Sequence, residues 1–331
     1  MAWPHLRRVP PLFALTVGIS LSLSACGGRA APAGGPTASP TAPAVPAAAT
    51  APAPAAGPAA IGVVGTENFY GDLLTQICGG RCAVTSILSD PNADPHEYES
   101  NAQDAVSVAN ARLVVRNGGG YDTFMGHLLA ASPNPRRQVI TVQTLIGAPD
   151  GANPHFWYDT ETMAHVAAAT ADALGRVDPA HAAGYRATAQ RYVAALQPVR
   201  AEVSAIRAAH PAAPVAYTEP VFGYMGDALG LRVRTPAAFQ RAVEDGNDPS
   251  AAALAAQQDL FSKHQVQVLI YNEQTVTPVT ARIQHLATAD GIPIVGVTET
   301  EPSGKTYQQW MLTQLQALHG ALDRGGTAGG H

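Results

Sequence analysis

The chain lacks the features that mark several large protein classes. Only 14% of its 331 residues are charged, and 20 Lys and Arg stand against 25 Asp and Glu. The resulting formal net charge of −5 argues against nucleic acid as a partner, because phosphate binding needs a basic face. No internal apolar run is long enough to cross a bilayer, and 31 Gly are too few for a collagen-like chain. A hydrophobic content of 46% instead predicts a globular protein of about two domains.

Cysteine is also scarce, and the first of the three lies at the end of an export signal. Residues 1–25 contain two Arg, then an apolar run at 11–23, then small residues before Cys26. This pattern predicts a signal peptide, and 23–26 resembles the bacterial lipoprotein processing site, which would leave Cys26 as a lipidated N-terminus. Residues 26–60 hold eight Pro, much Ala and one charged side chain, so we expect an extended tether.

The two other cysteines are Cys78 and Cys82, which are four positions apart around a Gly-Gly pair. In an exported protein this spacing predicts a local disulfide. A zinc site built on the pair is the alternative, but the chain has no second Cys pair to complete it.

The folded part alternates between strand and helix patterns, which predicts an α/β fold with parallel sheets flanked by helices. Apolar strand runs are expected at 61–65, 84–88, 113–117, 139–142, 215–217, 231–234, 266–271 and 293–297. Helical spacing is expected at 67–77, 104–110, 121–131, 221–229, 250–264, 279–290 and 307–322. We interpret the pattern as two lobes, an N-terminal one at 61–177 and a C-terminal one at 210–324, with a flexible tail at 325–331.

The two lobes are expected to be joined by a long spine helix at 178–209. Asp178 and Pro179 are a favourable helix start, and apolar residues recur every three to four positions as far as Ile206. A helix of about 30 residues would span roughly 45 Å. Pro198 is expected to bend it or to divide it in two.

Four loops carry side chains that suit a metal ion. His96 and His155 each follow a Pro in the N-terminal lobe, and a neutral imidazole is a good ligand for transition metals. In the second lobe, Glu219 and Glu299 follow strands. Taken alone, Glu219 is also compatible with a helix-capping role and Glu299 with a solvated loop, and Glu301 competes with Glu299 for the fourth position.

These segments carry a resemblance to a known family. Residues 94–99, 153–159, 219–224 and 292–299 resemble, in order, the four ligand segments of the cluster A-I metal-binding lipoproteins. These are the solute-binding proteins of zinc and manganese ABC importers, also called periplasmic solute-binding family 9. The resemblance implies two α/β lobes joined by a rigid helix, with the metal between them. By motif position it implies His96, His155, Glu219 and Glu299 as the metal ligands.

The sequence departs from the typical zinc members at the third ligand, where it has Glu219 in place of His, as manganese members do. A carboxylate is a harder ligand and favours manganese, although zinc is bound more tightly by most ligand sets. The choice between Zn²⁺ and Mn²⁺ therefore stays open. Tyr271, Asn272 and Gln274 follow a strand and are candidates to support the ligands from a second shell, or else are ordinary polar residues at a strand end. The remaining His residues, among them His319, are interpreted as structural.

The resemblance predicts a binding protein that captures a divalent transition metal as cargo and delivers it to the permease of an ABC importer. We expect an extracytoplasmic monomer, at the cell surface or in the periplasm, held to the bilayer by lipidated Cys26. A metal-binding adhesin or buffer is an alternative that would have the same site. A metallo-hydrolase is a further alternative, opposed by the lack of a His-Glu-x-x-His helix and by four ligands that leave no obvious water position. No enzymatic activity is expected.

Overall fold

The structure is a computed structural model that describes residues 60–90 and 98–328. The expected signal peptide, Cys26 and the tether up to residue 59 lie outside the described residues, and so does His96. Within the described ranges, no helix combines the length and the apolar character that crossing a membrane requires.

The N-terminal lobe is built on a parallel sheet with the strand order β2-β1-β3-β4. Its strands are β1 (Ile61–Glu67), β2 (Cys82–Leu88), β3 (Leu113–Arg116) and β4 (Gln138–Thr141). Its helices are α1 (Asn68–Cys78), α2 (Ala102–Asn110), α3 (Thr123–Ala131), α4 (Val142–Ile146) and α5 (Thr160–Val177). Side chains alternate across β3, so Leu113 and Val115 pack with α1 and α5 while Val114 packs with α2 and α3. Both faces of the sheet are thereby covered, as expected for parallel strands.

The C-terminal lobe repeats this topology in the order β6-β5-β7-β8. Its strands are β5 (Pro214–Tyr217), β6 (Arg232–Val233), β7 (Val268–Asn272) and β8 (Ile294–Val297). Its helices are α8 (Gly223–Leu229), α9 (Ala237–Glu244), α10 (Ala251–Ser262), α11 (Pro278–Ala289) and α12 (Tyr307–Ala328). All pairings in the two sheets are parallel, so each sheet presents its carboxyl strand ends at one edge. The predicted fold class is confirmed.

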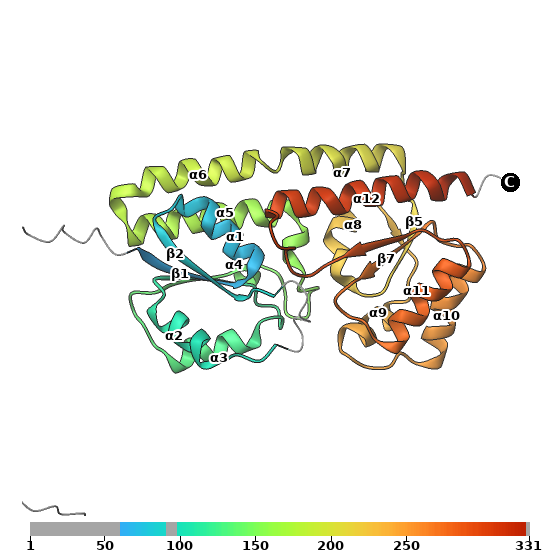
Figure 1. Ribbon diagram of the computed structural model, residues 1–331, viewed down its shortest axis with the longest axis horizontal. Helices are drawn as coiled ribbons and strands as arrows, with labels where there is room; N and C mark the ends of the chain where they lie inside the picture. The colour runs from blue at the N-terminus through green and yellow to red at the C-terminus, as the bar shows by residue number, and fades with distance from the viewer. Residues whose placement is uncertain (1–59, 91–97, 329–331) are drawn as a thin grey trace, which may run out of the picture. The chain divides into compact units, whose positions relative to one another are not determined.

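The predicted spine is two helices, α6 (Ala182–Ala194) and α7 (Gln197–Ala209) (Figure 1). The break falls at residues 195–196, just before Pro198, which occupies the first turn of α7. A proline is harmless there, because the first turn of a helix has no partners for its N–H groups. The expectation of one helix is therefore corrected, and the alternative of a division near Pro198 holds.

Four other elements differ from the sequence-based expectation. α4 and α9 were not expected, and β6 is two residues long instead of four. α9 is short, and its buried apolar residues, Phe239 and Val243, are only one turn apart, which is too little periodicity to recognise in a sequence. The last helix continues past its expected end at 322 to Ala328, so the expected tail begins within it.

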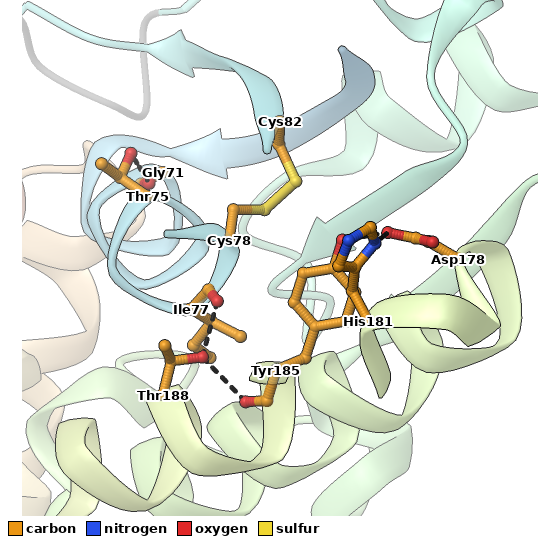
Figure 2. Close-up of a disulfide and its surroundings, with 9 residues drawn as sticks. All are labelled: Gly71, Thr75, Ile77, Cys78, Cys82, Asp178, His181, Tyr185 and Thr188. Atoms are coloured by element: carbon orange, nitrogen blue, oxygen red, sulfur yellow. Dashed lines mark hydrogen bonds and ion pairs between the residues drawn. A yellow bond between two sulfur atoms is a disulfide. The ribbon is translucent and has the colours of Figure 1, made fainter. Parts of the chain in front are cut away.

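A disulfide joins Cys78, the last residue of α1, to Cys82, the first residue of β2 (Figure 2). Gly79 and Gly80, between them, have φ angles of 56° and 83°, which glycine adopts at little cost. The same turn rests on α6, where Thr188 Oγ1 donates a hydrogen bond of 2.6 Å to the carbonyl of Ile77. The bridge therefore fixes the connection from α1 to β2.

Aromatic residues hold the two lobes together next to the carboxyl ends of the strands. Tyr158, from the N-terminal lobe, donates a hydrogen bond of 2.7 Å to the carbonyl of Thr298 and packs edge-on against Phe222. From the C-terminal lobe, the hydroxyl of Tyr307 on α12 donates a hydrogen bond of 2.6 Å to the carbonyl of Trp157. All these rings are buried in one apolar cluster that spans both lobes. This cluster therefore holds in place the loops that lie between the two lobes.

Candidate metal centre

His155 is fully buried, and its ring is fixed by Asn153, two residues earlier. Asn153 Nδ2 donates to the carbonyl of Pro220, so Oδ1 is the atom that faces the imidazole, 2.7 Å from Nδ1. An oxygen in that position accepts the Nδ1 hydrogen, and the Nε2 lone pair is then directed at Glu299, whose Oε2 lies 3.2 Å away. A ring held in one tautomer by an acceptor on its other nitrogen is the usual arrangement of a metal-binding His.

Two acids from the second lobe complete this arrangement. Glu219 follows β5 and Glu299 follows β8, and both carboxylates are buried, with exposed fractions of 3% and 0%. Asn272, the last residue of β7, lies between them: its Nδ2 is 2.5 Å from Glu219 Oε2 and 2.7 Å from Glu299 Oε1. The ends of three neighbouring strands therefore bring two carboxylates to one amide group.

Of the three residues expected to support the ligands, two contact this region. Asn272 bridges the acids, and Gln274 Oε1 accepts hydrogen bonds from the backbone N–H groups of Glu299 and Thr300. Tyr271 does not meet the expectation among the described contacts, because it packs into the apolar cluster of α9, α10 and α11. Neighbouring residues of a strand face opposite sides, so Tyr271 and Asn272 cannot both face the site.

Tyr121 is a further contact that the sequence did not indicate. Its hydroxyl donates a hydrogen bond of 2.9 Å to Glu299 Oε2, across the two lobes. Burial, and then the charge of Glu299, raise the pKa of Tyr121 well above its usual value, so it remains a donor. The loop of residues 118–120 that places it has φ angles of 78°, 67° and 89°, which explains the three consecutive glycines before Tyr121.

Glu244 is a third acid near the imidazole. It ends α9, its side chain is 15% exposed, and its Oε1 lies 3.9 Å from His155 Nε2. No sequence pattern indicated this approach, since it depends on a helix that was itself not expected. Imidazole nitrogen and carboxylate oxygen are together the donor set of a divalent transition-metal site.

A family model described as zinc-uptake complex component A, periplasmic, matches residues 63–321. The chain belongs to this family. The manganese-binding lipoprotein MntA of Halalkalibacterium halodurans is 28% identical over 178 residues, which cover 51% of this chain and 58% of that protein. The match thus spans little more than half of that relative's length.

Solved structures share the two-lobe fold of this zinc-uptake family member. The periplasmic zinc-binding protein TroA of Treponema pallidum superposes with a TM-score of 0.68 at 21% identity, covering 78% of this chain and 98% of that one. The Mn²⁺ complex of the solute-binding protein FpvC of Pseudomonas aeruginosa gives 0.66 at 23% identity, with coverages of 80% and 99%. At these identities the likeness concerns the fold alone, and the ligand set depends on this chain's own residues.

In this zinc-uptake family member, the described hydrogen bonds of Glu301 go to α1 and not to the imidazole. Its backbone N–H donates to Asn68 Oδ1 over 2.9 Å, and Asn68 Nδ2 donates to its carbonyl, both at the start of α1. Burial, and then the nearby Asp72, raise the pKa of Glu301 to about 9. The structure therefore gathers Glu299, and not Glu301, with His155.

Proposed function

We propose that this chain is the substrate-binding protein of an ABC importer, which captures Zn²⁺ or Mn²⁺ between its lobes and delivers it to the membrane permease. The proposed ligands are His155, Glu219 and Glu299, with His96 as the fourth, which lies outside the described residues. The observation that carries the proposal is the buried contact of His155 Nε2 with Glu299, 3.2 Å across the two lobes. Membership of a metal-uptake family supports a transport role and gives no support to an enzymatic one.

The arrangement accounts for both capture and closure. Glu219, Glu244 and Glu299 all come from the C-terminal lobe, and the first and last of them are buried. Carboxylates near one another repel unless a cation or a proton intervenes. A divalent ion would remove that repulsion and attach the acids to the imidazole of the other lobe. Binding would therefore draw the lobes together, and release at a permease would require separating them again.

The choice of metal depends on two opposing effects. Oxygen donors suit Mn²⁺, and Glu244 adds a third carboxylate to the two expected ones. Zn²⁺ binds more tightly than Mn²⁺ to nearly any set of nitrogen and oxygen ligands, so ligand type alone gives only a preference. We propose that the carboxylates of this site favour Mn²⁺, and that the higher general affinity of Zn²⁺ limits this preference.

We also propose that the mature chain begins at lipidated Cys26 and is tethered outside the membrane by the Pro-rich residues up to 60. These residues lie outside the described ranges, and the sequence pattern supports the proposal. Mass spectrometry of the membrane fraction tests it, because a diacylated N-terminal Cys26 is expected and an intact residue 1 would contradict it.

The test of the metal proposal is elemental analysis of the protein isolated without chelator from its own cells, grown with both metals. One Mn²⁺ per chain is expected, and one Zn²⁺ per chain would support the import function with the opposite metal preference. Protein that is isolated without metal, and that binds neither ion when titrated, would disprove the metal function.

A further inference from the structure

A second group of metal-binding side chains lies on the outer helices, away from the loops between the lobes. It consists of His210, which follows the last residue of α7, and of His319 and Asp323 on α12. His319 and Asp323 are four residues apart, so they share one face of their helix. α12 packs against α7, and His210 therefore meets that face.

The three side chains have the spacing of a metal site. One donor atom of each lies within 4.8 Å of the other two. His210 Nε2 is 3.0 Å from Asp323 Oδ1, and the two imidazole rings meet edge to face with their centroids 5.6 Å apart. The side chains of His210, His319 and Asp323 are 14%, 27% and 65% exposed, so an ion from the solvent can reach them.

A fourth residue, Glu202 on α7, orients one of the rings. Its Oε1 lies 2.7 Å from Nδ1 of His319 and accepts the hydrogen of that nitrogen. The lone pair of His319 is then on Nε2, the nitrogen that remains for a metal. A carboxylate that holds the other nitrogen of a His ligand is a regular feature of metal sites, and it also raises the basicity of the ring.

We propose that His210, His319 and Asp323 bind a second transition-metal ion of the Zn²⁺ class, with Glu202 as the residue that positions His319. Two imidazoles and one carboxylate match the three protein ligands that Zn²⁺ uses in sites whose fourth position is taken by water. Because the ligands come from α7 and α12, the ion would link the end of the spine to the C-terminal helix. The proposal is independent of the metal centre between the lobes.

The competing explanation is an ordinary surface ion pair of His210 with Asp323, which would give the same short contact without any metal. The two explanations differ in stoichiometry. We would strip the full chain with a chelator, titrate it with Zn²⁺ alone, and count bound ions by equilibrium dialysis and native mass spectrometry. The wild type is expected to bind one ion more than His319→Gln or Asp323→Asn.

Each variant has a defined role in this test. Asp323→Asn changes a largely exposed side chain, so it provides the answer if His319→Gln does not fold. Glu202→Gln is expected to keep the extra ion but to weaken its binding by about 10- to 100-fold, the usual cost of losing a supporting partner. His285→Gln, on the exposed face of α11, is the matched control and is expected to bind as many ions as the wild type.

The test depends on a difference of one bound ion between the wild type and the variants His319→Gln and Asp323→Asn. That difference is expected whether or not the metal centre between the lobes binds an ion. If that centre fails to bind, the wild type is expected to hold one ion and His319→Gln none. Equal stoichiometry in the wild type, His319→Gln and Asp323→Asn would overturn the proposal and leave the surface ion pair. An equal loss in His285→Gln would also overturn it, since the binding would then be an unspecific property of exposed imidazoles.

Discussion

The two lobes have the same strand order but contribute different chemistry to the space between them. The N-terminal lobe supplies an imidazole and a phenol, from His155 and Tyr121, whereas the C-terminal lobe supplies the carboxylates of Glu219, Glu244 and Glu299. The shared topology explains why the side chains meet, because parallel strands place their following loops at one edge of the sheet. The loop residues decide which lobe carries the charge. Among the described residues of this centre, the imidazole therefore comes from one lobe and the carboxylates come from the other.

Buried carboxyl groups of the two lobes also differ in their surroundings. Glu299 has a hydrogen-bond donor at each oxygen, from Tyr121 and Asn272. Glu67, at the end of β1, is equally buried, but neither of its oxygens has a partner among the described residues. Burial, and then the charge of Asp122, raise the pKa of Glu67 well above its usual value. We therefore expect Glu67 to be neutral in the folded protein.

Removing the imidazole is expected to have the largest effect. In His155→Ala, the carboxylates of one lobe lose their described contact with a nitrogen of the other, so metal affinity should fall by more than about 100-fold, beyond the cost of losing a supporting residue. Competition titration with a fluorescent chelator measures it. His165→Ala, an exposed residue on α5, is the matched control. Unchanged affinity in His155→Ala would remove this residue from the site.

The two acids of the last loop allow a sharper comparison. Glu299→Gln is expected to weaken metal binding by about 100-fold or more, since it removes a ligand rather than a supporting partner. Glu301→Gln is expected to leave the affinity nearly unchanged, because the described hydrogen bonds of Glu301 go to Asn68 on α1, whereas Glu299 contacts His155. Isothermal titration of both variants with Mn²⁺ tests the assignment. The reverse order of effects would make Glu301 the fourth ligand.

The sequence predicted what depends on local pattern and missed what depends on tertiary placement. The strands and the loops with His155, Glu219 and Glu299 were recognisable because apolar runs and Pro-flanked polar residues are local signals. Glu244 approaches the imidazole only through the packing of α9, which no local signal indicated. Tyr271 is a different case, because strand alternation beside Asn272 already implied that it faces the other side.

Replacing an acid with an imidazole is expected to change selectivity more than affinity. Glu219→His would give the C-terminal lobe a nitrogen ligand and should shift the preference toward Zn²⁺ over Mn²⁺ by roughly tenfold, or about 1.4 kcal/mol. Competitive loading with both ions, followed by elemental analysis, measures the ratio. Glu219→Gln is the control, since it removes the charge without supplying an imidazole. An unchanged ratio in Glu219→His would exclude Glu219 from the ligand set.

The smallest expected effect concerns stability and the neutral carboxyl of the first lobe. Because the pKa of Glu67 is raised in the folded protein, the native state binds its proton more tightly than the unfolded state does. The free energy of unfolding should therefore fall as the pH rises from the ordinary Glu pKa toward the raised value. Glu67→Gln cannot lose a proton, so its stability relative to the wild type should increase as the pH rises above the ordinary Glu pKa. Urea titrations in chelator measure this difference, with Glu161→Gln, 66% exposed on α5, as the control. A constant difference between Glu67→Gln and the wild type as the pH rises would mean that Glu67 is ionised in the folded protein, and that its lack of hydrogen-bond partners does not distinguish its charge from that of Glu299.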